Sequence, residues 1–268
     1  MSKHTQDIID TWDIATFPTA VIRLLEEQHD VLTQYYVREC ELDEGSNPDD
    51  IDQILRSNRF EDSFLALTTE RIPNLLSTEH LRGWHYTRLL DIEVEKLQRD
   101  GIQVSTWERM CTRLSLLQKE GFLSSSEVSK LIANSPLNDP TQHKSRKDLF
   151  WMTSKPTPVS NPGITPLVSH WGGEVIYFWQ DDSLLMSKLK SLGKTRIVEV
   201  RAPLSSSNIR HRAADSMVAQ YAFKSGMQAY TKPFDARVEN DLPASNILNI
   251  HTEGTESFNV IAEGIPSQ

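Results

Sequence analysis

The spacing of apolar residues changes along the chain, and this change most strongly limits the folds open to it. In the first part, apolar residues recur at helical intervals over Thr16–Cys40 and Phe60–Ile72, with a shorter helical pattern at Asp50–Arg56. Pro73 is expected to stop the second of these helices, because the residue before a proline is biased away from helical geometry. Residues 1–78 are therefore predicted to form a small helical unit.

The rest of the chain, residues 79–268, mixes two kinds of pattern. Short runs rich in aromatic and β-branched residues are typical of strands, and segments with helical spacing of apolar residues separate them. The predicted strands are Gly83–Arg88, Leu149–Thr153, Glu174–Trp179, Thr195–Val200 and Ile247–Ile250. We therefore expect an α+β domain over residues 79–268, preceded by the helical unit.

Capping residues mark helix ends between these strands. Asp91–Asp100 is predicted to be a helix that ends at Gly101, since glycine readily takes the left-handed conformation at a helix C-terminus. Ser105–Glu108 and Ser124–Glu127 have the Ser-x-x-Glu spacing of a capping box, which predicts a helix start at each. A further helix is expected around Arg210–Lys224.

The charge balance narrows the choice of partners. The chain carries 28 Lys and Arg against 37 Asp and Glu, a formal net charge of −9. Such a balance argues against a protein whose main role is to bind a phosphate backbone, although it leaves room for a local basic site.

The sequence shows neither a signal for export nor a segment that crosses a membrane. The N-terminal segment is polar, and no apolar run approaches the roughly 20 residues that cross a bilayer. Cys40 and Cys111 are too few for a disulfide framework. We therefore expect a cytoplasmic protein without a membrane partner.

A metal site is not expected. The histidines are dispersed, and the closest pair, His80 and His85, shares neither a helix face nor a strand face. The H-E-x-x-H and paired-cysteine signatures of zinc sites do not occur in the sequence.

Two segments carry side chains that suit a flat, polar ligand. His85 and Thr87 are two residues apart on a predicted strand, so both point to one face and can hold the same ligand. Gly172 and Gly173 precede a predicted aromatic strand, on which Tyr177 could stack on a ligand that approaches the glycines. Each has a structural alternative: His85 half-buried against a backbone carbonyl, and Tyr177 as part of the core.

These two segments resemble motifs of a known superfamily. His85-Tyr86-Thr87, followed by a helix and Gly101-Ile102, resembles the first motif of ADP-ribosyltransferases of the diphtheria-toxin and poly-ADP-ribose polymerase type. Gly173–Phe178 is similar to their second motif, in which a turn of small residues enters a strand that carries a tyrosine. The resemblance covers about residues 80–255. The run Trp171–Glu174 also resembles a group of uncharacterised bacterial proteins, which adds no activity.

The resemblance implies a split β-sheet core that binds NAD as a substrate. His85 would then donate to the adenosine ribose and Thr87 would support the nicotinamide ribose. Tyr177, entered through Gly173, would stack on the nicotinamide. Such an enzyme cleaves the nicotinamide–ribose bond and transfers ADP-ribose to an acceptor, here a protein, a nucleic acid or water.

The third motif of that superfamily is a strand that carries a catalytic glutamate. Glu239 fits the order of motifs best, and Glu199 and Asp235 are the alternatives. A carboxylate at this point would bond a hydroxyl of the nicotinamide ribose and stabilise the oxocarbenium-like charge of the transition state. Glu199 also suits a structural role, as an outward-facing polar residue of an alternating strand.

A second hypothesis belongs to a different class of function. The chain would keep the fold without the chemistry and act as a non-catalytic interaction or inhibitor module. With a net charge of −9, such a module would favour a basic protein as its partner, because opposite charges steer the encounter.

Overall fold

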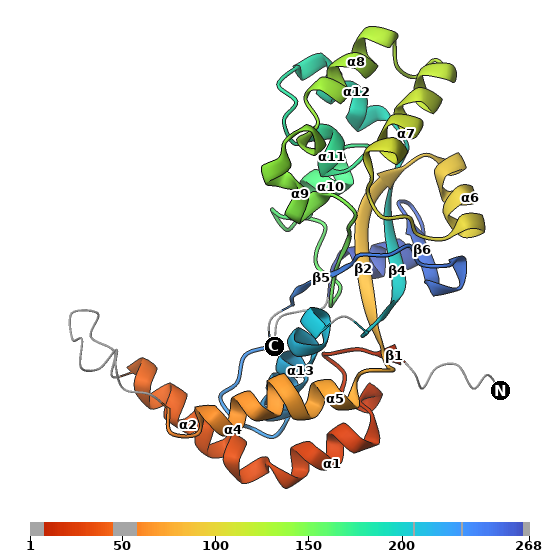
Figure 1. Ribbon diagram of the computed structural model, residues 1–268. Helices are drawn as coiled ribbons and strands as arrows, with labels where there is room; N and C mark the ends of the chain where they lie inside the picture. The colour runs from red at the N-terminus through yellow and green to blue at the C-terminus, as the bar shows by residue number, and fades with distance from the viewer. Residues whose placement is uncertain (1–7, 45–57, 206, 232, 265–268) are drawn as a thin grey trace, which may run out of the picture. The chain divides into compact units, whose positions relative to one another are not determined.

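The structure is a computed structural model that describes residues 8–44, 58–205, 207–231 and 233–264 (Figure 1). It combines helices with a mostly antiparallel sheet, so the expected α+β class is confirmed. The chain forms two compact units: unit 1 is residues 1–82, 202–234 and 266–268, and unit 2 is residues 83–201 and 235–265. The sequence places a domain boundary between residues 78 and 79, and this boundary stays a prediction.

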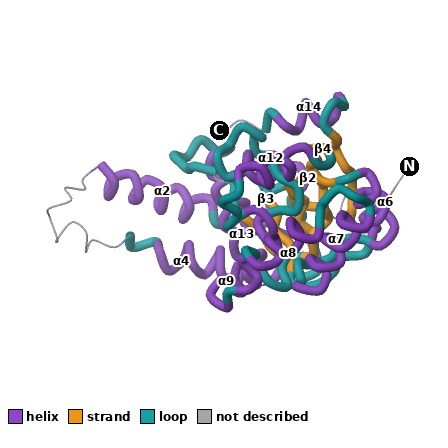
Figure 2. Tube along the Cα trace, turned by 90° about the horizontal axis from the view of Figure 1, so that it is seen from above, coloured by secondary structure: helices purple, strands orange, loops and turns teal. Residues whose placement is uncertain are grey.

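Unit 1 is mainly helical, as its apolar spacing predicts. Its elements are β1 (Ile8–Ile9), η1 (Ile14–Thr16), α1 (Thr19–Glu27), α2 (His29–Glu44), α4 (Glu61–Ala66), η2 (Leu67–Arg71), α5 (Ile72–Leu75) and α13 (Ser207–Lys224). The helix predicted over Thr16–Cys40 is in fact two, because the chain leaves helical geometry at Gln28. In both views α2 and α4 lie side by side (Figures 1 and 2). The helix predicted at Asp50–Arg56 lies outside the described residues.

The prediction that Pro73 stops a helix is wrong. The helix that begins at Glu61 continues through Pro73 to Leu75, and its middle, η2, is π-helical. There the N–H of Ile72 donates to the carbonyl of Leu67, five residues back. A π segment shifts the hydrogen-bond register by one residue, and such bulges are one of the ways in which a helix adapts to a proline.

The side chain of one buried residue in unit 1 makes no hydrogen bond with a described residue. Gln220 on α13 is 1% exposed, and neither polar atom of its side chain has a partner among the described residues. An unpaired buried amide costs about 1–3 kcal/mol in desolvation. We therefore expect Gln220→Met to raise the free energy of unfolding by about that amount.

Chemical denaturation would measure this effect. Gln228→Met is the control, since Gln228 is exposed and should respond little. A loss of stability in Gln220→Met would mean that the amide makes hydrogen bonds in solution.

The sheet follows the order β5-β3-β2-β4-β6, with β1 paired to β2 off this path. Its strands beyond β1 are β2 (His80–Leu89), β3 (Phe150–Thr153), β4 (Lys194–Pro203), β5 (Asp235–Val238) and β6 (Ile247–Thr252). β1 runs parallel to β2, whereas β2–β3, β3–β5 and β4–β6 are antiparallel. Four of the five predicted strands are confirmed; β1 and β5 were not predicted.

The helices of unit 2 are α6 (Asp91–Asp100), α7 (Trp107–Lys119), α8 (Ser125–Ala133), η3 (Pro136–Asn138), α9 (Pro140–Arg146), α10 (Thr165–Ser169), α11 (Glu174–Tyr177), α12 (Ser183–Ser191), η4 (Ala244–Asn246) and α14 (Glu256–Ala262). Unit 2 has one apolar cluster, to which α7, α8, η3, α10, α11 and α12 contribute side chains. The helix end at Gly101 and the capping box at Ser124 are confirmed. The cap of α7 is Thr106, one residue after the predicted Ser105.

The strand predicted at Glu174–Trp179 is wrong, because this segment begins with the short helix α11. Gly172 and Gly173 have φ angles of +97° and +70°, which turn the chain sharply before the helix. Ile176 and Tyr177 then pack into the apolar cluster of unit 2. Burial in this cluster outweighs the strand preference of aromatic and β-branched residues.

Trp171 anchors the turn. Its side chain is fully buried, its indole Nε1 donates to Glu93 Oε2 at 2.7 Å, and the Arg113 guanidinium lies 4.7 Å from its ring. A Cβ on Gly172 would stand 2.5 Å from Ile176, so no larger residue fits there. Gly172 therefore serves close packing of the chain, whereas nothing lies within 4 Å of a Cβ added at Gly173, where the φ of +70° is what favours glycine.

Candidate functional site

His85 is held by backbone and ring contacts within unit 2. Its Nδ1 lies 2.7 Å from the carbonyl oxygen of Trp151, and its ring packs on Phe150 with centroids 4.3 Å apart. Loss of hydration in this packed site lowers the pKa of His85 to about 4, although the hydrogen bond to Trp151 acts in the opposite direction. At neutral pH the ring is therefore uncharged, and its Nδ1–H donates to the Trp151 carbonyl oxygen on β3.

This arrangement makes folding sensitive to acid. Because the pKa of His85 is about 4 when folded against 6.5 normally, the unfolded chain binds more protons between these pH values. The free energy of unfolding should therefore fall as the pH drops from 7 towards 4. We expect His85→Gln, whose amide can still donate to the Trp151 carbonyl, to lose less stability than the parent on this change. Melting temperatures at pH 7 and pH 5 would test this; equal losses in both proteins would contradict it.

Thr87 and Tyr177 are both buried. Tyr177 packs against His170 with ring centroids 5.0 Å apart, and burial raises the pKa of its phenol. His170 in turn has its Nδ1 3.1 Å from the carbonyl of Pro166. The contacts of His85 and Tyr177 are thus with different neighbours, and their roles in NAD binding stay predictions.

The candidate carboxylates lie in two kinds of surroundings. Glu199 on β4 is buried, and its Oε2 lies 3.3 Å from Nε2 of His251. Asp235 and Glu239, at the start of β5 and just beyond its end, are exposed. Glu239 forms an ion pair with Arg237, with 3.6 Å between oxygen and nitrogen.

Next to Glu239 lies a surface that we call the aromatic–arginine surface. Its members are Arg146, Trp151, Phe178, Trp179 and Arg237. The three aromatic side chains are 37%, 47% and 40% exposed, respectively. Exposed aromatic residues that gather in one place are typical of binding surfaces.

Stacking contacts hold this surface in shape. Arg237 and Trp151 are opposite each other in the β3–β5 ladder, and the guanidinium lies 5.4 Å from the indole ring. The guanidinium of Arg146 lies 4.3 Å from the ring of Phe178, which neighbours Trp179. The Trp151 indole N–H donates to the carbonyl of Ser145 at 2.8 Å and so joins the two stacks.

Two ion pairs border the surface. Glu174 lies 3.0 Å from Arg146, and Glu239 pairs with Arg237. Each arginine therefore stacks on one aromatic ring and is neutralised by one carboxylate. His85 is connected to this surface by its hydrogen bond to the Trp151 backbone.

The sequence patterns did not predict this surface and pointed only to Glu239, which borders it. A usable signal was present: the basic run His143–Lys147 is followed closely by Trp151, and Phe178 and Trp179 are adjacent. Arg237 gives no signal by itself, since only the strand pairing brings it to Trp151.

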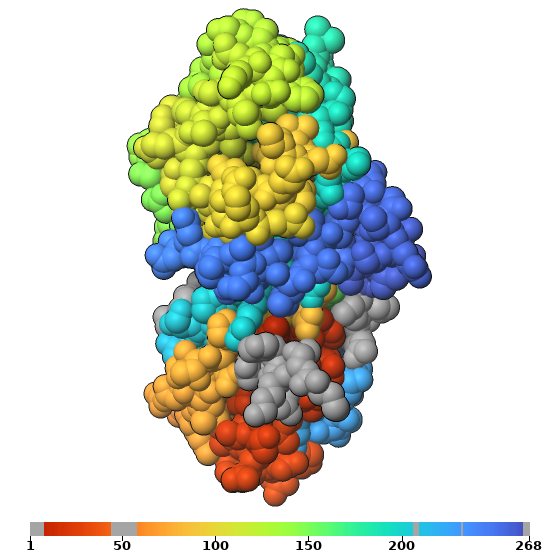
Figure 3. Space-filling view, turned by 90° about the vertical axis from the view of Figure 1, so that its right-hand side faces the viewer, coloured from red at the N-terminus to blue at the C-terminus, as the bar shows by residue number. Residues whose placement is uncertain are grey.

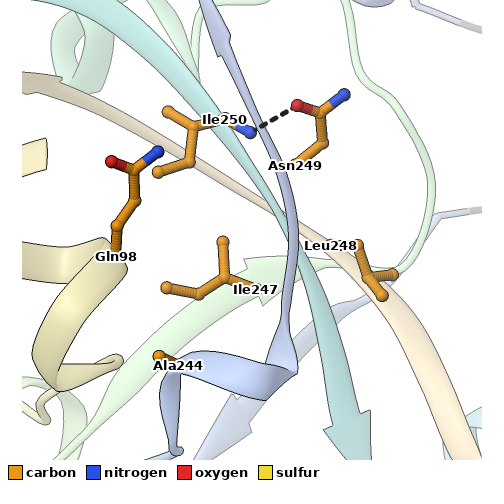
Figure 4. A pocket seen from close by; sticks show the side chains of 6 residues that line it. All are labelled: Gln98, Ala244, Ile247, Leu248, Asn249 and Ile250. Atoms are coloured by element: carbon orange, nitrogen blue, oxygen red, sulfur yellow. Dashed lines mark hydrogen bonds between the residues drawn. The ribbon is translucent and has the colours of Figure 1, made fainter. Parts of the chain in front are cut away.

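A small open pocket lies elsewhere in unit 2, between α6 and β6 (Figure 4). Its volume is about 500 Å³ when the open solvent at its mouth is included, and it is lined by Gln98, Ala244, Ile247, Leu248, Asn249 and Ile250. None of the residues expected to bind NAD lines it.

In the part of the chain that the structure describes, no group of three or more His, Cys, Asp or Glu is placed to hold a metal ion. None of the described helices is long and apolar enough to cross a membrane. Comparison of the chain with protein-family models, curated proteins and solved structures finds no match.

Proposed function

We propose that the chain is a non-catalytic protein-binding module that holds its partner through the aromatic–arginine surface. One observation carries this proposal: Arg146 stacks on Phe178 and Arg237 on Trp151, and the Trp151 indole N–H connects the two stacks by its hydrogen bond to the carbonyl of Ser145, next to Arg146. Aromatic residues and arginine are enriched in protein interfaces, and they supply most of the binding energy there. The stacking also fixes these side chains before binding, which reduces the entropy lost on association.

The charges around this surface favour an acidic partner. Glu174 and Glu239 are already paired with the two arginines. Lys144 and Lys147, at and just after the C-terminal end of α9, are exposed and form no ion pair with a described residue. The proposed partner is therefore a protein segment that combines acidic residues with an aromatic or aliphatic anchor. The basic partner expected from the net charge needs a different surface.

Defined peptides would test this proposal. A fluorescent 12-residue peptide in which Glu alternates with Trp and Leu should bind, and its Lys counterpart should bind more weakly. Raising the salt concentration should weaken binding of the Glu peptide, because salt screens the interaction between exposed charges. Trp151→Ala should lower the affinity at least tenfold, as loss of a central aromatic anchor does.

Ile92→Ala is the matched control, because Ile92 is also an exposed apolar residue of unit 2 but lies on α6. It should leave the affinity unchanged. Equal binding of the Lys and Glu peptides, or equal effects of the two substitutions, would count against the proposal.

A second candidate is the NAD-dependent ADP-ribosyltransferase with a split-sheet core. The observation that favours it is the order of elements: His85 and Thr87 lie on β2, and α6 follows and ends at Gly101. Its test is an assay with labelled NAD, scored for nicotinamide release and for transfer. Release that disappears in Glu239→Gln would favour the enzyme over the binding module. Absence of release in the parent protein would favour the module.

A further inference from the structure

β6 forms one edge of the sheet. It pairs with β4 on one side, and no described strand pairs with its other side. The register shifts between Glu199 and Val200, so Leu248 is an extra residue of β6 and its side chain is 37% exposed. An open edge presents backbone donors and acceptors to which another extended chain can pair.

Hydrogen bonds identify which groups point outward. Glu253 donates its N–H to the carbonyl of Thr195, so these two residues form a hydrogen-bonded pair at the start of the ladder. Hydrogen-bonded and non-bonded pairs alternate along an antiparallel ladder. Ile250, paired with Val198 three residues further along, is therefore in a non-bonded pair and directs its N–H and carbonyl to the open edge.

The side chain of Asn249 confirms this orientation. The N–H of Ile250 donates to Oδ1 of Asn249 at 2.8 Å instead of to β4 (Figure 4). A backbone donor at the free edge is thus occupied by a short, local hydrogen bond. Such a bond protects an unpaired edge, and an incoming strand can replace it.

The pocket lies directly beside this edge. Ile247, Ile250 and Ala244 point towards Gln98 on α6 and form its wall in Figure 4. A strand added next to β6 would present every second side chain to this side of the sheet. Ile247, Ile250 and Ala244 offer an aliphatic side chain an apolar wall, and the amides of Gln98 and Asn249 make the rest of the lining polar.

The surroundings of β6 are acidic. No Lys or Arg occurs in the sequence after Arg237, whereas Glu253 and Glu256 follow β6 directly and are exposed. Of the cations at this end of the ladder, Lys194 and Arg196 pair with Asp91, and Arg88 lies 3.9 Å from the Glu253 carboxylate, which leaves Glu256 as the acidic group for an incoming cation. In the space-filling view, the segment from η4 to α14 (blue) lies at the surface next to α6 (yellow) (Figure 3).

We propose that the open edge of β6 binds an extended, basic peptide segment of another protein as an added strand. Its backbone pairs with the outward groups of Ile250, and an aliphatic side chain enters the pocket. A lysine or arginine of the segment lies near Glu256. This mode of recognition takes its affinity from main-chain hydrogen bonds and its specificity from the pocket. It uses a surface separate from the aromatic–arginine surface, so either proposal can fail alone.

Binding of a synthetic peptide by fluorescence anisotropy tests the proposal. The probe is an eight-residue peptide of alternating Thr and Val with a central Leu and two terminal Lys. Asn249→Ala should raise its affinity about three- to tenfold, because the competing hydrogen bond to Ile250 is gone. Ile250→Pro should abolish binding, since proline removes the outward N–H but leaves the ladder to β4 intact. Trp151→Ala should have no effect.

Two further comparisons complete the test. Glu256→Gln should lower the affinity for the lysine peptide and should not lower the affinity for the same peptide ending in two Glu. Methylation of alternate backbone nitrogens in the peptide should abolish binding. The proposal is overturned if the methylated peptide binds equally well or if Asn249→Ala has no effect. It is also overturned if Asn249→Ala makes the protein a dimer without peptide, because the edge would then pair with a second copy.

Discussion

Replacing Trp171 with alanine is expected to lower the free energy of unfolding by about 3–5 kcal/mol, the usual cost of deleting a fully buried aromatic side chain. Three losses combine in this variant. The apolar cluster of unit 2 loses its largest member, Glu93 loses a hydrogen-bond donor, and Arg113 loses the ring on which it stacks. Urea denaturation followed by circular dichroism would measure the change.

Trp171→Phe is the informative comparison. Phenylalanine fills most of the volume and keeps a ring for Arg113, but it cannot donate to Glu93. We expect it to lose clearly less stability than Trp171→Ala. If both variants were as stable as the parent, the Trp-Gly-Gly-Glu segment would not be a structural anchor, and a direct role in ligand binding would become the better explanation.

Local patterns predicted much of the fold. The helix end at Gly101 and the capping box at Ser124 depend on a few neighbouring residues, and they were found as expected. The same holds for the strands around Ile197 and Ile250, whose β-branched composition matches a sheet surface.

Long-range packing decided the elements that were missed. The segment Glu174–Trp179 has strand composition, yet the anchor at Trp171 and the two turned glycines direct it into a helix. β5 is only four residues long, so the alternation of polar and apolar residues in Asp235–Val238 is too short to predict a strand; its pairing with β3 defines it. Since that pairing brings Arg237 to Trp151, the candidate site was hidden for the same reason as the strand.

Tertiary contacts also explain the first of the two motifs that suggested an ADP-ribosyltransferase. Gly101 ends α6 with φ +84° and ψ −171°, a region that almost only glycine occupies. The next residue, Ile102, exchanges two backbone hydrogen bonds with Leu242, at 2.8 and 2.9 Å. The Gly-hydrophobic pair therefore has a structural purpose: it fastens the chain just before η4 and β6 to the end of α6.

Gly101→Ala should consequently be among the most damaging small substitutions in unit 2. A Cβ at this position would stand 2.2 Å from the carbonyl oxygen of Leu242, and the other close atoms also belong to the backbone. Gly121→Ala is the matched control, because Gly121 has a similar φ of +76° but nothing within 4 Å of an added Cβ. The loss of unfolding free energy should be larger for Gly101→Ala by about 3 kcal/mol, the upper range of overpacking, since backbone atoms cannot move aside as side chains do. Similar losses in the two variants would mean that glycine is needed at position 101 only for its positive φ, and that Leu242 can move away from α6 at little cost. In that case the Gly-hydrophobic pair would lose its structural explanation, and the resemblance to the NAD-binding motif would gain weight.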